Sequence, residues 1–312
     1  MTTSIVHLPE REDMLSGNRT CAGCGLAIAL RHILKALDGK AIFVVPASCL
    51  TVLGGMYPIS SVRVPWMNVV FPGVAAAATG LVAGLRATRR SGLTVVAMAG
   101  DGGTCDIGLQ GLSGAAERND DFIYICYDNE AYMNTGTQRS GTTPCAALTS
   151  TTPAPGKQQF PKDMPRIMEA HGVPYIATAC AAYPNDLYDK VLKARAMTGL
   201  RYIHLSTPCP PGWSFPATDT IAMGRAAVES GFVVLYEIEH GRFQLTGKSL
   251  TLASVRTTAL KPLANYFAPQ GRYKGMDTAT LESLQHWVNK RWQACLKRQF
   301  PGVAAEDSSR AP

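Results

Sequence analysis

The chain alternates short apolar runs with longer segments in which apolar residues recur every three or four positions. The runs at 41–46, 93–99, 122–127 and 202–206 have the length and apolar character of strands buried in a parallel sheet. Segment 26–37 has the spacing of a helix. Similar patterns predict helices at 74–84, 165–171, 185–197 and 218–230, a strand at 173–179 and a hairpin over 232–245. Alternating strands and helices predict an α/β fold, with a parallel sheet flanked by helices.

The sequence Gly100-Asp101-Gly102-Gly103 follows directly on the run at 93–99. Glycine lets the backbone approach a ligand closely, and a helical pattern begins near Gly103. The free N–H groups at the start of such a helix favour an anion. This turn is therefore a candidate binding site for a diphosphate.

Asp128 and Asn129 end the next apolar run, at 122–127. The carboxyl ends of parallel strands meet at one edge of a sheet, where open α/β folds bind ligands, so Asp101 and Asn129 are expected there together. A carboxylate, an amide oxygen and a nearby loop carbonyl suit Mg²⁺, which keeps other positions for phosphates. The alternative, which the Gly-Asp-Gly sequence alone would favour, is an ordinary strand–turn–helix with a capping aspartate.

This arrangement resembles the thiamine diphosphate signature, and Asp128–Ser140, DNEAYMNTGTQRS, is similar to the β subunits of the pyruvate:ferredoxin oxidoreductase family. The resemblance covers most of residues 15–275. It implies the thiamine diphosphate-binding fold, with Asp101, the Asn129 side chain and the Ala131 carbonyl holding Mg²⁺. Asn134, the implied catalytic residue, would lie near the thiazolium and the substrate carbon. The implied cofactor-binding residues are Gly100, Asp101, Gly102, Gly103, Asn129, Ala131, Tyr132, Asn134 and Thr135.

The nine cysteines occur in a chain whose N-terminus lacks the features of a signal peptide, which points to metal or redox chemistry and not to a disulfide framework. Cys21 and Cys24 precede the first helix, whereas Cys49 and Cys209 each follow a predicted strand, so the four thiols could converge at one edge. Four thiolates suit a [4Fe–4S] cluster, but zinc competes for them. The family resemblance favours the cluster, because in bacterial and archaeal-type relatives cysteines at these places are its ligands.

The remaining cysteines and two of the histidines are interpreted as structural. Cys126 and Cys180 lie in or at the end of apolar strands, where cysteine packs as a small hydrophobe. Cys105 and Cys145 are near the cofactor loops in sequence only, and Cys295 belongs to the C-terminal helix. His171 and His204 have no spacing typical of a metal site or a catalytic triad.

Composition and charge fit one large α/β core with appendages. The chain has 312 residues, 46% apolar and 17% charged, with 30 Lys and Arg against 23 Asp and Glu. No apolar run approaches the ~20 residues of a membrane-spanning helix, and we expect a cytoplasmic protein. From residue 241 to 300 there are ten basic and two acidic residues without a nucleic-acid motif, so we expect subunit contacts there and no nucleic acid.

We divide the chain into three parts. Residues 1–18 form an N-terminal arm, 19–240 the thiamine diphosphate-binding domain with its cluster loops, and 241–312 a C-terminal extension with a disordered tail. The Thr-, Ser-, Pro- and Gly-rich loop after Ser140, through Gln159, is expected to wrap a neighbouring subunit.

The expected function is that of the β subunit of a 2-oxoacid:ferredoxin oxidoreductase. Thiamine diphosphate serves in C–C cleavage of 2-oxoacids, and a cluster on the same chain favours oxidation over simple decarboxylation. The resemblance implies that pyruvate is converted to acetyl-CoA and CO₂ and that electrons pass through clusters to ferredoxin. It also implies two partners: an α-type subunit with the pyrimidine-contacting glutamate and substrate-binding residues, and a ferredoxin-like cluster subunit. The chain has no second thiamine-type domain, so it is expected to be active only in a complex.

Three alternatives stay open. Around Cys49 the pyruvate enzymes commonly carry Gly and Glu where this chain has Ser48 and Thr51, followed by Gly54-Gly55-Met56, so oxalate is a second candidate substrate. A non-redox thiamine lyase with structural zinc, or a binding subunit with a relic site, would belong to other functional classes.

Overall fold

The computed structural model describes residues 8–55, 58–254 and 260–301. The first part of the expected N-terminal arm, Met56 of the segment near Cys49, and almost all of the expected disordered tail lie outside these ranges.

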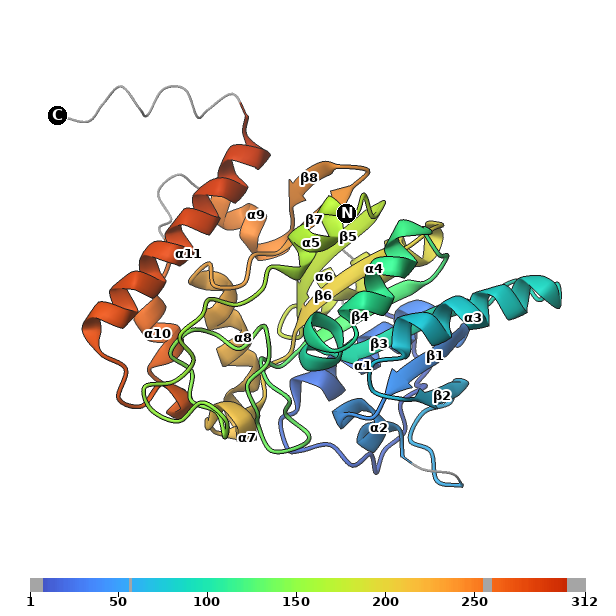
Figure 1. Ribbon diagram of the computed structural model, residues 1–312, viewed down its shortest axis with the longest axis horizontal. Helices are drawn as coiled ribbons and strands as arrows, with labels where there is room; N and C mark the ends of the chain where they lie inside the picture. The colour runs from blue at the N-terminus through green and yellow to red at the C-terminus, as the bar shows by residue number, and fades with distance from the viewer. Residues whose placement is uncertain (1–7, 56–57, 255–259, 302–312) are drawn as a thin grey trace.

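An eight-stranded sheet in the order β2-β1-β3-β4-β6-β5-β7-β8 runs through the molecule (Figure 1). Its first six strands are parallel, and β7 and β8 are antiparallel to their neighbours, so the α/β class is confirmed for a mixed, mostly parallel sheet. The boundary expected after residue 240 falls in the β7–β8 turn, and β8 joins the same sheet. The strands are β1 (Ala41–Pro46), β2 (Trp66–Val69), β3 (Thr94–Gly100), β4 (Ile123–Asp128), β5 (Tyr175–Cys180), β6 (Arg201–Ser206), β7 (Tyr236–Glu239) and β8 (Arg242–Leu245).

Helices cover both faces of this sheet. Helices α1 and α6 pack on one face, and α3, α4 and α5 on the other, while α11 lies along the side at β8 (Figure 1). The helices are α1 (Gly25–Leu37), α2 (Cys49–Gly54), α3 (Val74–Ala87), α4 (Leu109–Glu117), α5 (Met164–Ala170), α6 (Pro184–Ala196), α7 (Pro210–Trp213), α8 (Thr220–Glu229), α9 (Gly247–Ser254), α10 (Leu263–Phe267) and α11 (Thr278–Gln299). Three short helical turns complete the described elements: η2 (Gly102–Asp106), η3 (Ala217–Asp219) and η4 (Gly271–Tyr273).

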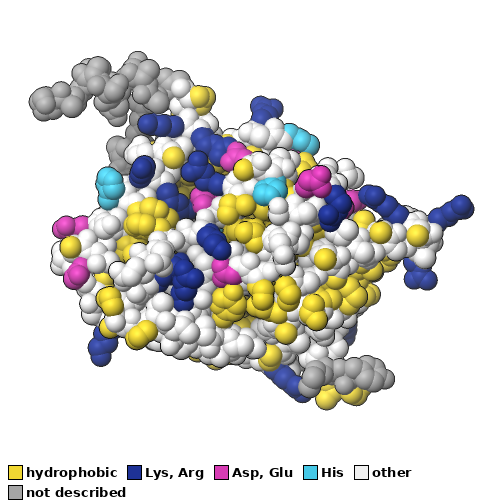
Figure 2. Space-filling model, viewed as in Figure 1, with side chains coloured by type: hydrophobic (Ala, Val, Ile, Leu, Met, Phe, Trp, Pro, Cys, Tyr) yellow, Lys and Arg dark blue, Asp and Glu magenta, His cyan; other side chains and the backbone are white. Residues whose placement is uncertain are grey.

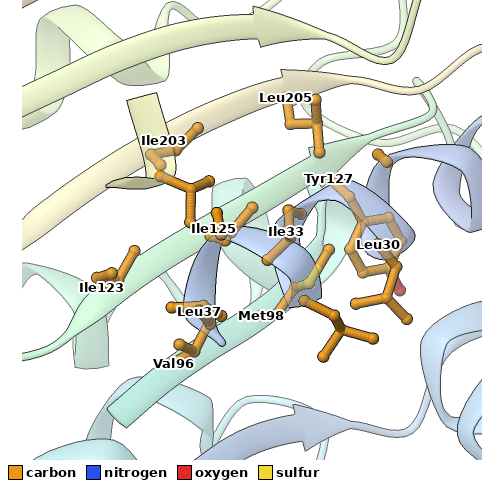
Figure 3. Packing of buried hydrophobic residues seen from close by; sticks show 14 of the residues in the cluster. Leu30, Ile33, Leu37, Val96, Met98, Ile123, Ile125, Tyr127, Ile203 and Leu205 are labelled. Atoms are coloured by element: carbon orange, nitrogen blue, oxygen red, sulfur yellow. The ribbon is translucent and has the colours of Figure 1, made fainter. Parts of the chain in front are cut away.

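The packing of α1 fixes the start of this helix beside the site. Leu30, Ile33 and Leu37 share one face because their spacing follows the helical period. They lie against side chains of β3, β4 and β6 (Figure 3). Burial of a side chain of this size stabilises a fold by roughly 1.5–3 kcal/mol. This packing holds the N-terminal end of the helix, at Cys24 and Gly25, near the carboxyl ends of the strands. There the Gly25 N–H donates to the Pro208 carbonyl beyond β6, at 3.1 Å.

Two elements differ from the sequence prediction. Residues 49–54 form α2 instead of a loop, with Ser48 as N-cap accepting from the Leu50 N–H at 3.3 Å. Helix α3 runs to Ala87, three residues past the predicted end, with Arg86 in its last turn, and Arg89 adopts φ 53° beyond it. Basic side chains gather at the tip where α3 ends (Figure 2).

The strand order reverses between β1 and β3. From β1 the chain goes outward to β2, and it then crosses to β3 and β4 on the other side of β1. In open α/β sheets such a reversal leaves a crevice at the carboxyl ends of the strands, where ligands bind.

Candidate active site

A cavity of about 200 Å³ opens at this crevice. It lies at the carboxyl ends of β1, β3 and β4, and all nine predicted cofactor-binding residues are in its wall. Ser48, Cys49 and Phe71 line it as well. Asn134 and Thr135 are exposed in the wall, so the residue predicted to face the substrate is open to solvent in this chain.

Three oxygen atoms face one another in the wall of the cavity. The Asn129 Oδ1 atom lies 3.1 Å from Asp101 Oδ1 and 3.0 Å from the Ala131 carbonyl oxygen, and none of the three can donate a hydrogen bond to another. Two oxygens at right angles around Mg²⁺, each at 2.0–2.1 Å, lie about 2.9 Å apart. Both distances from the Asn129 side chain therefore fit neighbouring positions around an octahedral cation. If the Asn129 amide is rotated by about 180°, its nitrogen donates to both Asp101 Oδ1 and the Ala131 carbonyl. These three groups can therefore also form hydrogen bonds without a cation.

The second carboxylate oxygen of Asp101 is held by hydroxyl groups. Asp101 Oδ2 accepts from Ser140 Oγ at 2.5 Å and from Thr142 Oγ1 at 3.0 Å, and Thr142 also lies 2.9 Å from Asp128 Oδ1. Burial, together with the nearby Asp128 carboxylate, raises the pKa of Asp101 well above its usual value. A buried carboxylate beside another carboxylate is costly without a compensating positive charge, which is what a cation would supply.

The sequence analysis missed these hydroxyl groups. Ser140 and Thr142 are fully buried within this chain, although they begin the loop that was expected to wrap a neighbouring subunit. Lys157 of the same loop is also buried and donates to the carbonyls of Gly141 and Thr143 at 3.1 and 2.5 Å. The start of the loop and Lys157 are buried because their polar groups find partners inside the chain, whereas residues 150–151, 153–155 and 158–159 are exposed.

The glycine turn after β3 accommodates a tyrosine ring. A Cβ atom on Gly102 would lie 2.7 Å from the Tyr132 ring, so the close approach of these two residues needs glycine. The Tyr132 hydroxyl lies 3.1 Å from Asp106 Oδ2 and donates there. The helix expected from Gly103 starts as the π-type turn η2, and α4 begins at Leu109.

The Cys21–Cys24 turn is docked on the Cys209 loop. Besides the bond between Gly25 and Pro208, the Thr220 hydroxyl of α8 donates to the Gly23 carbonyl at 2.6 Å. Gly23 has φ 69°, and a Cβ atom there would lie 2.3 Å from the Ala217 carbonyl oxygen. This position therefore needs glycine both for its backbone conformation and for the close contact.

The four thiols predicted as cluster ligands are neighbours. Burial, and then the charges of the other thiols of the set, raise the pKa of both Cys49 and Cys209 to about 12. In the ranges that the structure describes, no three His, Cys, Asp or Glu side chains are placed to hold a single metal ion. A [4Fe–4S] cluster takes one thiolate per iron, so its ligands are more widely spaced than those of one zinc ion. Cys49 also lines the cavity, so the set of four cysteines lies next to it.

A buried ion pair supports the Asn129 turn from behind. Arg272 Nη2 lies 2.5 Å from Glu130 Oε2, and the Arg272 guanidinium stacks 4.1 Å from the Trp213 ring centre. The Trp213 indole N–H donates to the Asn129 carbonyl at 2.8 Å. Burial raises the pKa of Glu130 to about 7 despite the nearby Arg272. No sequence motif marks these residues. The signal that the sequence offers is that Trp213 lies four residues, about one helical turn, after the predicted cluster ligand Cys209.

None of the five remaining cysteines lines the cavity, and neither do His171 and His204. All nine cysteines fall in the described ranges and are free thiols; Cys105, Cys126 and Cys180 are buried, and Cys145 and Cys295 are half-buried. His204 contacts Asp128 Oδ2 at 3.0 Å and the Tyr202 hydroxyl at 2.9 Å, and it lines a separate cavity of about 90 Å³. His171 contacts Ser113 at 2.8 Å. Within the described ranges, none of the helices combines the length and apolar character needed to cross a bilayer.

Comparison with known proteins identifies relatives of the whole chain. A family model for the C-terminal, thiamine pyrophosphate-binding domain of thiamine pyrophosphate enzymes matches residues 59–205. The chain is 46% identical to pyruvate synthase subunit PorB of Methanothermobacter marburgensis, over 90% of this chain and 96% of the relative. It is 40% identical to ketoisovalerate oxidoreductase subunit VorB of Pyrococcus abyssi, over 93% and 94%. A solved 2-oxoglutarate:ferredoxin oxidoreductase from Magnetococcus marinus superposes with a TM-score of 0.56 at 25% identity, covering 67% of this chain and 72% of that chain.

Proposed function

The chain belongs to the thiamine diphosphate-dependent 2-oxoacid:ferredoxin oxidoreductases as a β-type subunit, and on this premise we propose that its complex oxidises pyruvate. Pyruvate and coenzyme A would give acetyl-CoA, CO₂ and a proton, and the two electrons released would pass singly to two ferredoxins. The names of the pyruvate synthase relatives support this substrate.

The observation that carries the proposal is the meeting of the Asp101 carboxylate, the Asn129 side-chain amide and the Ala131 carbonyl in a cavity that Cys49 also lines. Asp101, Asn129 and the Ala131 carbonyl would hold Mg²⁺ and, through it, the diphosphate. Bound thiamine diphosphate supplies the electron sink for C–C cleavage next to a carbonyl. The chain's own residues contribute the charge at Asp101, the close backbone approach at Gly102 and the exposed amide of Asn134 at the cavity mouth.

Cys21, Cys24, Cys49 and Cys209 would hold a [4Fe–4S] cluster that accepts the electrons. The other thiols of the set contribute to the raised pKa of Cys49 and of Cys209, and the Gly25 N–H joins the Cys21–Cys24 turn to the Cys209 loop. Both observations support this set. Because Cys49 lies in the cavity wall, one ligand of the cluster would be adjacent to the cofactor. In the alternative of a thiamine lyase with structural zinc, the purified protein would be colourless, whereas a cluster gives a brown protein with broad visible absorption.

The complex would need an α-type subunit to complete the cofactor site. Among the described residues lining the cavity there is no glutamate to contact the aminopyrimidine. Four large apolar side chains between α2 and the residue after β2 are exposed, and burial by a partner would remove them from water: Val52, Ile59, Met67 and Val70. A ferredoxin-like cluster subunit and ferredoxin would take the electrons onward. Nine free thiols fit a reducing compartment such as the cytoplasm.

The test is an anaerobic assay of the whole complex, with pyruvate, 2-oxoisovalerate, oxalate and 2-oxoglutarate, each with and without coenzyme A. We expect ferredoxin reduction that is fastest with pyruvate and depends on coenzyme A. The second candidate is a branched 2-oxoacid, because the ketoisovalerate relative is nearly as similar as the pyruvate relatives. The reported relatives give no support to oxalate. Decarboxylation without electron transfer would refute the oxidoreductase proposal.

A further inference from the structure

The cation-facing oxygens and the cluster thiols lie on loops that are distant in sequence. Asn129 directly follows β4, whereas Cys209 follows β6 and precedes α7. Trp213, the last residue of α7, is fully buried between them. Its indole N–H donates to the Asn129 carbonyl at 2.8 Å, and its own backbone N–H donates to the Cys209 carbonyl at 2.9 Å. One residue therefore bonds directly to both loops.

A second contact joins the same two loops. A Cβ atom on Gly212 would lie 2.0 Å from Met133 Sδ and 3.4 Å from Cys209 Sγ. The Met133 side chain is thus packed onto the backbone beside the cluster cysteine, and Asn134 follows it in the chain. Movement of the Cys209 loop would push directly on the segment that carries the predicted catalytic amide.

The orientation of the indole is itself fixed. Arg272 stacks on one side of the Trp213 ring at 4.1 Å, and Tyr266 meets the ring edge-on with centroids 6.4 Å apart. Arg272 is held in turn by Glu130, the residue that follows Asn129, so the contacts form a closed loop from the Asn129 turn through Arg272 and Trp213 back to that turn. A closed set of buried contacts of this kind restricts both loops to one relative arrangement.

We propose that Trp213 is a positioning residue that holds the Asn129 turn and the Cys209 loop at a fixed separation, so that cofactor and cluster stay aligned for electron transfer. This inference rests on the proposed function of the two sites. It assigns to Trp213 and Arg272 a role in the rate of transfer between the sites, beyond their contribution to folding.

The deciding variant is Trp213→Phe in the intact complex. Phenylalanine keeps an aromatic face for Arg272 but removes the N–H bonded to Asn129. We expect normal iron and sulfide content, about tenfold weaker Mg²⁺-dependent binding of thiamine diphosphate by calorimetry, and about tenfold slower bleaching of the cluster by the 2-oxoacid. Bleaching by dithionite, which bypasses the thiamine site, should keep its wild-type rate.

Two further variants make the result specific. Arg272→Lys keeps a charge opposite Glu130 but loses the planar stacking of the guanidinium. It should therefore also weaken thiamine diphosphate binding and slow the bleaching of the cluster by the 2-oxoacid. If Trp213→Phe does not assemble, this variant tests the proposal in its place. Trp292→Phe is the matched control, because this buried tryptophan of α11 packs in a different core cluster from the one that contains Trp213. It should leave both readouts unchanged.

Wild-type values for cofactor binding and substrate-driven bleaching in both test variants would overturn the inference. A loss of iron that accounts for the whole loss of rate would overturn it too, since Trp213 would then serve folding alone. Failure of the proposed function is distinguishable, because the wild-type complex itself would then show no bleaching by any 2-oxoacid.

Discussion

Replacing Asp101 by asparagine should separate the binding role of this residue from its structural role. Asparagine has the same shape, and its amide oxygen can still accept from the hydroxyls of Ser140 and Thr142, which hold Asp101 Oδ2 at 2.5 and 3.0 Å. Its amide nitrogen can donate to Asn129 Oδ1, where the carboxylate Oδ1 lies at 3.1 Å. The substitution therefore removes the charge and keeps the hydrogen-bonding contacts.

Two effects of opposite sign follow from the burial of Asp101. Removing one partner of a buried charge pair costs roughly 3–5 kcal/mol, and each 1.4 kcal/mol is about a factor of ten in affinity. Mg²⁺-dependent binding of thiamine diphosphate should thus weaken by roughly 10² to 10⁴. In the metal-free protein the raised pKa of Asp101, caused by burial and by Asp128, shows that the charged form is disfavoured there. Asp101→Asn should therefore leave the metal-free Tm equal or higher.

The assay combines calorimetric titration of thiamine diphosphate at several Mg²⁺ concentrations with Tm measurements in chelator, both on the purified complex. Asp38→Asn is the matched control, because Asp38 is exposed at the end of α1 and adopts φ 52°, which asparagine tolerates. Binding within threefold of wild type in Asp101→Asn would show that Asp101 is not the charged ligand. A lower metal-free Tm would show that the carboxylate is needed for folding and would contradict the electrostatic reasoning.

Cys209→Ser should lower the anaerobic iron and acid-labile sulfide content and leave thiamine diphosphate bound, whereas Cys145→Ser should change neither; the reverse pattern would contradict the ligand set. The isolated chain should show no turnover, because the described cavity wall contains no glutamate, and activity free of co-purifying subunits would refute this. Burial and the nearby Arg139 lower the pKa of Lys157 from 10.5 to about 8. The unfolded chain then binds more protons between these values, so stability should rise as pH increases from about 8 to about 10.5. In Lys157→Met, urea unfolding should show a smaller rise over this range, and an equal rise would exclude Lys157 as its source.

The parts predicted from sequence are those whose cause is local. Buried strands such as β3 and β4 are continuous apolar runs, and the polar residues that end them must reach the sheet edge together because the strands are parallel. That reasoning placed Asp101 and Asn129 in one cavity. Strand β2 escaped prediction because its four residues are half-buried or exposed at the sheet edge and give no apolar run. Helix α2 escaped because a six-residue helix capped by Ser48 has no periodic pattern long enough to detect.

The groups that support the site could not be predicted, because each depends on a partner far away in the chain. Glu130 and Arg272 look like ordinary surface charges in the sequence, and burial as a pair becomes visible only when η4 lies behind the Asn129 turn. Trp213 resembles a core residue until its indole N–H is seen to donate to the Asn129 carbonyl. Contacts of this kind have no period or motif.

The start of the loop after Ser140 is buried inside the chain, which its composition did not indicate, for a physical reason that also explains the site. A run rich in Ser and Thr indicates exposure only if its hydroxyls have no buried acceptor. Here the acceptor is Asp101, the predicted cation ligand: Ser140 and Thr142 both bond to its Oδ2. With Oδ2 thus occupied, Oδ1 remains next to the Asn129 side chain, which in turn contacts the Ala131 carbonyl; a cation would sit on this side. Ser140 and Thr142 are buried because the buried carboxylate of Asp101 needs donors, and they leave its other oxygen free for the proposed metal.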